Sequence, residues 1–96
     1  MEIKRGVRAR GMSPEILLAI VIAEGIWESL GSELVITSLT DGRHGVGSYH
    51  HTGDAVDLRL PRSRAPEAAN KLSHKLGEGY DVVLEGNHIH VEYDPD

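Results

Sequence analysis

Cysteine and phenylalanine are both absent from the 96-residue sequence. Without cysteine, no disulfide can link parts of the chain, and a zinc site has to use histidine, aspartate or glutamate. Without phenylalanine, a core has to be built from isoleucine, leucine and valine, with Trp27 and a few tyrosines. The hydrophobic content of 40% is sufficient for one small core. We therefore expect a single folded domain, residues 13–96, preceded by a basic arm or edge strand, residues 1–12.

Long apolar runs and an excess of positive charge are also missing. The longest uninterrupted apolar run, residues 16–23, is too short to span a bilayer. The N-terminal residues 1–5 are largely charged and lack the apolar core of a signal peptide. The formal net charge is -5, whereas a phosphate-backbone partner favours a basic face. We therefore expect neither membrane insertion nor nucleic-acid binding.

Hydrophobic periodicity and turn residues predict an α+β order of elements. Ser13-Pro14-Glu15 is typical of a helix start, and the helix is expected to end at Gly31. Its core-facing stripe is expected to contain Ile16, Ile20, Ala23, Trp27 and Leu30, widened by Leu18 and Ile22. The second helix and the strands are expected over residues 66–76, and over residues 33–39, 55–60, 80–85 and 88–93. The expected fold is a small, mainly antiparallel sheet with helices packed on its apolar face.

The histidines are clustered rather than spread along the chain. Of the six, only His74 stands alone, on the second predicted helix, where we interpret it as a surface residue. The other five fall in two short stretches, which contain His44, His50 and His51, and then His88 and His90. Imidazole is the commonest metal-binding side chain, so this clustering favours a metal site.

Strand geometry predicts which residues share a face. If Gly86-Asn87 forms a two-residue turn, then Glu85 lies opposite His88 and the strands pair in register. Because faces alternate along a strand, one face becomes wholly apolar and the other carries Glu85, His88 and His90. The apolar face is then Tyr80, Val82, Leu84, Ile89, Val91 and Tyr93.

The preceding strand adds a carboxylate to the polar face. If its apolar residues share the core, Asp57 faces the same cleft as His90. His50 lies seven residues before Asp57, beyond a turn at Gly53, and can reach the same ion. Three protein ligands leave a fourth position open, which is the arrangement of a catalytic zinc site.

The same residues resemble two motifs of the M15 zinc peptidases, which include D-alanyl-D-alanine carboxypeptidases and phage L-alanyl-D-glutamate endolysins. Residues 48–57 match the motif Ser-x-His-x-x-Gly-x-Ala-x-Asp at every fixed position. Residues 85–90 are similar to the second motif, which ends in His-x-His. The wider group also contains lysostaphin-type peptidases and the hedgehog signalling domain. The resemblance therefore implies a fold of this group and one zinc ion per chain.

The resemblance also implies a role for each residue. The zinc ligands are expected to be His50, Asp57 and His90, although a Glu-x-x-His reading of the second motif would select His88 instead. Glu85 is expected to act as the base that activates the attacking water, and His88 to stabilise the tetrahedral intermediate. Arg43 and Arg59 are candidate substrate-binding residues, because the arginine that many members carry shortly after Thr37-Ser38 is absent here. Ser48, the first fixed residue of the first motif, is a third candidate.

The function implied is hydrolysis of a peptide bond in the stem peptides of bacterial peptidoglycan, as a carboxypeptidase or an endopeptidase. The alternative is a non-catalytic zinc module that binds a wall peptide or a protein partner; Glu85 argues against it, because a binding module needs no base. The expected location follows from the missing signal. We expect the chain to be made in the cytoplasm and either released to the periplasm or cell wall or carried by a phage.

Overall fold

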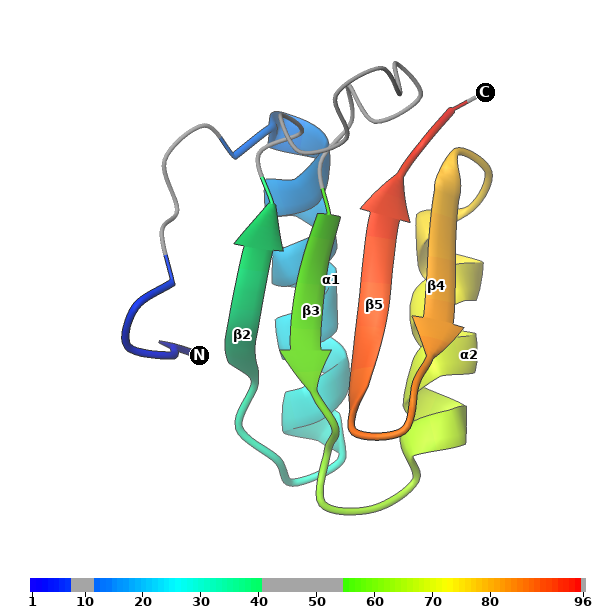
Figure 1. Cartoon of the computed structure of the whole chain (residues 1–96). Coiled ribbons are helices and arrows are strands. Elements are labelled where there is room, and N and C mark those ends of the chain that lie inside the picture. The colour runs from blue at the N-terminus through cyan, green and yellow to red at the C-terminus, as the bar shows by residue number, and fades with distance from the viewer. Residues whose placement is uncertain (8–11, 41–54, 96) are drawn as a thin grey trace.

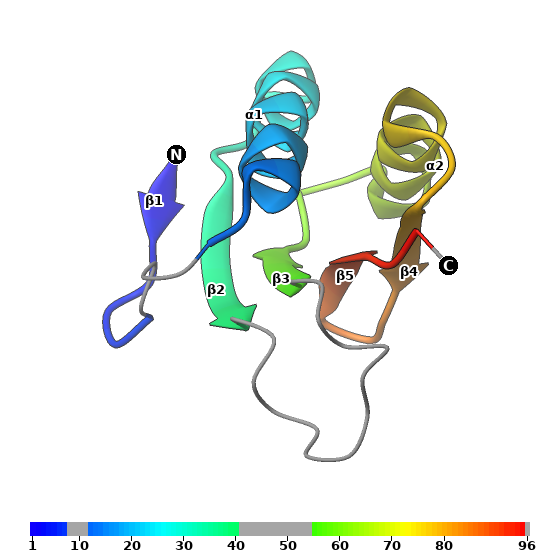
Figure 2. The same cartoon turned by 90° about the horizontal axis from the view of Figure 1, so that it is seen from above.

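The computed structural model describes residues 1–7, 12–40 and 55–95. They form one five-stranded sheet and two helices (Figure 1). The elements are β1 (Glu2–Ile3), α1 (Pro14–Ser29), β2 (Val35–Thr40), β3 (Ala55–Arg59), α2 (Ala65–Leu76), β4 (Tyr80–Leu84) and β5 (His88–Tyr93). Seen edge-on, both helices cover the same face of the sheet and leave the other face without a helix (Figure 2). The α+β class and the one-sided packing of the helices agree with the prediction.

The sheet is mixed, with the strand order β1-β2-β3-β5-β4. The short strand β1 pairs with β2 in parallel, so part of the N-terminal arm forms an edge strand. The other neighbours are antiparallel. The predicted hairpin register is confirmed, since Tyr80 lies opposite Tyr93 and Leu84 opposite Ile89. The hairpin is closed by a hydrogen bond from the backbone N–H of Glu85 to the carbonyl of His88, at 2.8 Å.

Helix α1 begins and ends where the sequence predicted. The side chain of Ser13 accepts a hydrogen bond from the backbone N–H of Ile16, at 3.2 Å, so that one of the unpaired amides of the first turn is satisfied. Gly31, with φ of 75°, follows the last turn in the left-handed conformation that glycine adopts without strain. Gly77, with φ of 77°, ends α2 in the same region of φ.

The core lies between the sheet and the two helices. Its largest fully buried side chains are Trp27, Ile16, Ile20, Leu34, Ile36, Leu58, Leu72, Ile89, Val56 and Val91. The indole N–H of Trp27 donates to the carbonyl of Arg59 at 3.0 Å, which ties α1 to the end of β3. One core prediction is wrong: Leu18 is 51% exposed. Leu18 lies two positions from buried Ile16, and two helical steps of about 100° turn it toward the solvent side.

Candidate metal centre

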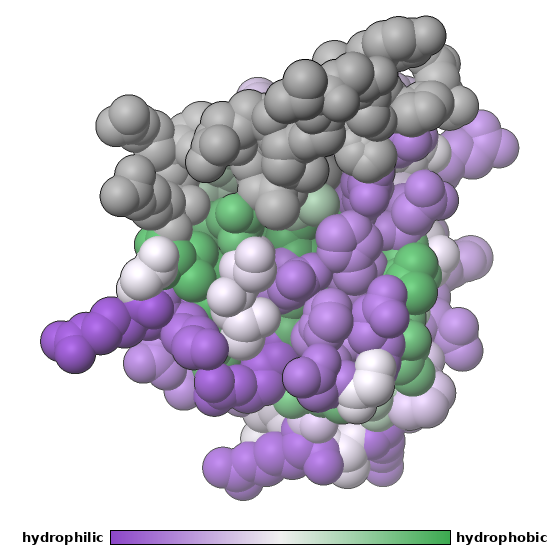
Figure 3. Space-filling view, viewed as in Figure 1, coloured by the Kyte–Doolittle hydropathy of each residue, from purple (hydrophilic) through white to green (hydrophobic). Residues whose placement is uncertain are grey.

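The candidate centre is on the face of the sheet that the helices leave open. Strand β3 lies beside β5, with Asp57 opposite His90, Arg59 opposite His88 and Ala55 opposite Glu92. Because Val56 and Leu58 point into the core, the residues between and beside them point the other way. A space-filling view of this face shows hydrophilic residues gathered over the neighbouring strands (Figure 3).

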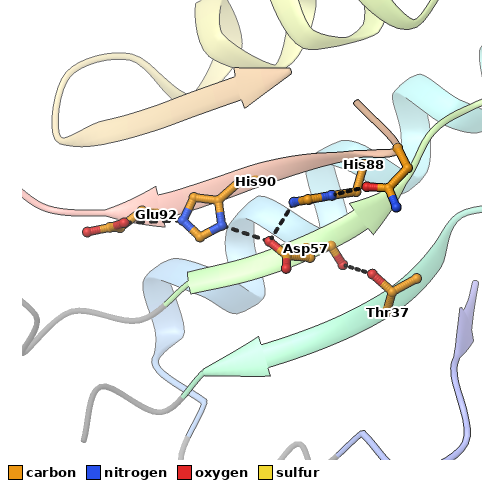
Figure 4. Close-up of polar contacts among 6 residues, drawn as sticks. Thr37, Asp57, His88, His90 and Glu92 are labelled. Atoms are coloured by element: carbon orange, nitrogen blue, oxygen red, sulfur yellow. Dashed lines mark hydrogen bonds and ion pairs between the residues drawn. The ribbon is translucent and has the colours of Figure 1, made fainter. Parts of the chain in front are cut away.

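Asp57 and His90 are in direct contact, as the hydrophobic pattern predicted. Nδ1 of His90 lies 2.7 Å from Oδ1 of Asp57 and donates to it (Figure 4). Nε2 of His88 lies 3.7 Å from the same carboxylate oxygen. The backbone of β3 is held at this position, since the hydroxyl of Thr37 donates to the carbonyl of Asp57 at 3.3 Å. One carboxylate oxygen therefore stands between two imidazoles.

The second imidazole is oriented by its neighbour in the chain. Nδ1 of His88 lies 2.7 Å from Oδ1 of Asn87, an acceptor, so Nδ1 carries the proton of the neutral ring (Figure 4). The lone pair of that ring is then on Nε2, the nitrogen nearer to Asp57. His88 is therefore positioned to accept a proton or to bind a cation at the same place as His90.

Glu92 completes the group and was not predicted. Its Oε1 lies 3.2 Å from Nε2 of His90, so the two ring nitrogens of His90 each meet a carboxylate (Figure 4). The strand parity that placed His88 and His90 on one face places Glu92 there as well, two residues further along. The alternation of residues along this strand is visible in the sequence and predicts that Glu92 shares the face of His90. The motif that is similar to the second M15 motif ends at His90 and does not include Glu92.

The two carboxylates change the proton affinity of His90. Partial burial by itself would lower the pKa of the imidazole, because a charged ring loses hydration. The hydrogen bonds to Asp57 and Glu92, together with their negative charges, outweigh that effect and raise the pKa above its ordinary value. The site thus stabilises a positive charge on the ring, between two carboxylate groups.

The other predicted site residues make no side-chain hydrogen bond or ion pair with this group, or lie outside the described residues. His50, Arg43 and Ser48 are outside the described residues. Glu85 is exposed, and its side chain has no hydrogen bond or ion pair with any described residue. Arg59 is exposed on the open face beside His88. The structure therefore brings together Asp57, His88 and His90, and leaves Glu85 at the rim of the hairpin.

The donor atoms, imidazole nitrogens and carboxylate oxygens, are of the type that binds a cation such as zinc. Two ligands on a tetrahedral zinc with bonds of about 2.0–2.1 Å stand roughly 3.3 Å apart. The separation of 2.7 Å from Asp57 Oδ1 to Nδ1 of His90 is shorter than that value, and the separation of 3.7 Å to Nε2 of His88 is longer, so both side chains would have to shift to bind one ion. Within residues 1–7, 12–40 and 55–95, no three histidine, aspartate or glutamate side chains form a group that could hold a metal ion by themselves. The hypothesis of a zinc site therefore requires a third ligand from residues 41–54, which include His50.

Comparisons with known proteins return nothing for this chain: no protein-family model, no curated protein and no solved structure matches it. In the part of the chain that the structure describes, neither helix has the length and apolar character needed to cross a bilayer.

Proposed function

We propose that the chain is a zinc-dependent peptidase that cleaves a peptide bond in peptidoglycan stem peptides. The observation that carries the proposal is the contact of 2.7 Å between Asp57 and His90, two of the three ligands that the sequence motifs select. The motifs are similar to those of the M15 peptidases, and Asp57, the last residue of the first motif, lies opposite His90, the last residue of the second. His50 is proposed as the third ligand. A fold of the hedgehog and D-Ala-D-Ala peptidase type belongs to this proposal.

The chemistry follows from the charges on the open face. A bound zinc ion acidifies water and polarises a carbonyl group. Glu85 is proposed as the base that takes the proton of the attacking water and returns it to the leaving amine. The side chain of Glu85 is exposed and makes no hydrogen bond or ion pair with the described residues, so it can turn toward the site when substrate binds. His88, oriented by Asn87, is proposed to take up a proton on Nε2 and then to stabilise, through that N–H, the charge that develops on the scissile carbonyl.

Glu92 is proposed as a positioning residue. A histidine that binds a metal through one nitrogen usually donates its other ring N–H to a carboxylate, which fixes the tautomer and the ring orientation. His90 meets that condition, because Nε2 faces Glu92 while Nδ1 faces Asp57. Glu92→Ala is expected to weaken zinc binding by about 10–100-fold, the usual cost of removing such a partner, and Glu92→Gln by less. Nitrogen NMR of the zinc-bound protein is expected to show a shifted Nε2 resonance of His90 in the Glu92→Ala variant, because the hydrogen bond from Nε2 to Glu92 is lost.

The decisive experiment separates zinc binding from turnover. Zinc affinity is measured by calorimetry, and activity by the products released from purified peptidoglycan. Asp57→Ala and His90→Ala are expected to lose zinc, by more than the roughly 100-fold that marks the upper range of outer-shell changes. Glu85→Gln is expected to retain zinc and lose hydrolysis, while Glu78→Gln, at another exposed glutamate, keeps both. Full activity in Glu85→Gln would exclude the proposed mechanism.

A zinc-containing binding module is the second candidate. The exposed side chain of Glu85 makes no hydrogen bond or ion pair with Asp57 or His90, and this favours the second candidate, because a binding module needs no base at the ion. If this candidate is correct, the chain holds zinc and binds peptidoglycan peptides in equilibrium dialysis but releases no products. In that case Glu85→Gln leaves both properties unchanged.

A further inference from the structure

Helix α1 is apolar on the side that faces solvent as well as on the side that faces the core. Leu17, Leu18 and Val21 are 52%, 51% and 57% exposed. A surface helix normally has one apolar stripe, and a helix that is apolar all round is normally buried on all sides. The outer face of α1 therefore has the character of a covered surface, although nothing in the described part of the chain covers it.

The outer face of α1 continues into a groove of about 800 Å³ between α1 and α2. Helix α1 contributes Ile22, Gly25 and Ile26, and helix α2 contributes Lys71, His74 and Lys75. Its floor is apolar and its α2 wall is basic. We name Leu17, Leu18, Val21, Ile22 and Gly25 the outer α1 face.

Gly25 marks the place where another helix can come close. Glycine inside a helix is about 1 kcal/mol less favourable than alanine. The packing of this chain gives no reason for it, because a Cβ added at Gly25 meets no atom within 4 Å in the described structure. Absence of a side chain at such a position allows the backbone of a partner to approach.

The two flanks of the outer α1 face carry opposite charges. Glu24 and Glu28 lie on the flank away from α2, where Glu24 contacts the N-terminal amine at 3.1 Å. Lys71, His74 and Lys75 form the opposite flank, along α2, where Lys71 also contacts Glu67 at 3.2 Å. An apolar strip with an acidic flank and a basic flank is complementary to a copy of itself.

We propose that the outer α1 face binds a second copy of this chain, with the two α1 helices side by side and pointing in the same direction. A two-fold axis parallel to α1 places the acidic flank of each copy against the basic flank of the other. An axis across the helices would bring like charges together. The dimer buries the face of the molecule opposite to the sheet face that holds Asp57 and His90, so both candidate sites stay accessible (Figure 2).

The test uses charge reversal on each flank. One variant carries Glu24→Lys and Glu28→Lys, and the other carries Lys71→Glu and Lys75→Glu. Each variant alone places like charges on both pairs of flanks of a dimer and is expected to dissociate at least about tenfold more readily than the wild type. An equimolar mixture of the two variants has opposite charges on both pairs of flanks and is expected to form a mixed dimer. Molar mass is measured by light scattering and sedimentation over a wide range of concentration.

Two controls keep the result independent of folding defects. Glu78→Lys, an exposed reversal in the turn after α2, is expected to leave the dimer intact. Gly25→Ala is expected to raise the thermal midpoint of the monomer and to weaken the dimer, which are opposite effects that a folding defect cannot produce. A wild-type chain that remains monomeric at the highest concentration overturns the proposal. A mixture that associates no better than the separate variants overturns it too.

Discussion

At the scale of single residues, His90 is the side chain at which protonation and the proposed zinc binding compete. Its ring lies between Asp57 and Glu92, and in the free protein the proton on Nδ1 occupies the space beside the Asp57 oxygen. A metal ion bound at that nitrogen has to displace this proton. If the chain binds zinc as proposed, zinc binding and proton release at His90 are therefore coupled.

The sign of the pH dependence follows from the raised pKa of His90. Zinc affinity is expected to fall as the pH decreases through that pKa, beginning above the ordinary histidine value of about 6.5. In the metal-free protein, the ring contributes stability that is fully present below about pH 6.5 and is lost as the pH rises through the raised pKa. Calorimetric zinc titration in two buffers with different ionisation enthalpies measures the proton release. His74→Ala should not alter it, whereas an equal zinc affinity at pH 5.5 and pH 8 would contradict the coupling.

At the scale of the elements, the sequence predicted the order and type of the two helices and the four main strands, because capping residues, glycine stops and apolar alternation are local signals. The hairpin register was predictable as well, since a slip by one residue would have exposed Ile89 and Val91. The parallel pairing of β1 with β2 was not, because two residues, Glu2 and Ile3, carry too little pattern. The outer face of α1 was missed for a related reason: apolar residues on all sides of a helix do not select one side.

One contact between elements can be tested directly. The hydroxyl of Tyr80, on β4, donates to the carbonyl of Glu15 in the first turn of α1 at 3.0 Å. Tyr80→Phe is expected to lower the free energy of unfolding by about 1 kcal/mol, measured by urea denaturation. Tyr93→Phe is the matched control, because its ring packs 4.9 Å from that of Tyr80 and no hydrogen bond of its hydroxyl is seen with the described residues.

The same tyrosine predicts a loss of stability at alkaline pH. Burial, followed by the charge of Glu15 and the proximity of Tyr93, raises the pKa of Tyr80 above 10.0. The neutral phenol of Tyr80 contributes to the free energy of unfolding below about pH 10, and this contribution is lost as the pH rises through the raised pKa. Tyr80→Phe should therefore show a weaker decline in stability above pH 10 than the wild type. An identical decline in both proteins would place its cause elsewhere.

At the scale of the whole molecule, a chain of 96 residues has a small core, so a bound ion contributes a large share of its stability. At a free zinc concentration of about 100 times Kd, binding is expected to add roughly 2.7 kcal/mol. For a domain of this size that corresponds to a rise of about 10 °C or more in the thermal midpoint. The rise is measured by calorimetry, is reversed by a chelator, and should be absent in Asp57→Ala. An equal rise in that variant would locate the zinc elsewhere.

The single tryptophan provides an optical reporter of this architecture. Trp27 is fully buried, and its indole N–H is bonded to the end of the strand that carries Asp57. All of the intrinsic indole emission therefore arises from one position, where the helix layer meets the sheet. A blue-shifted emission maximum of Trp27 indicates molecules in which α1 is packed on β3. A red-shifted maximum indicates molecules in which Trp27 is exposed to solvent. Mutations on the opposite face of the sheet can thus be checked for folding without a label and without any assay of function.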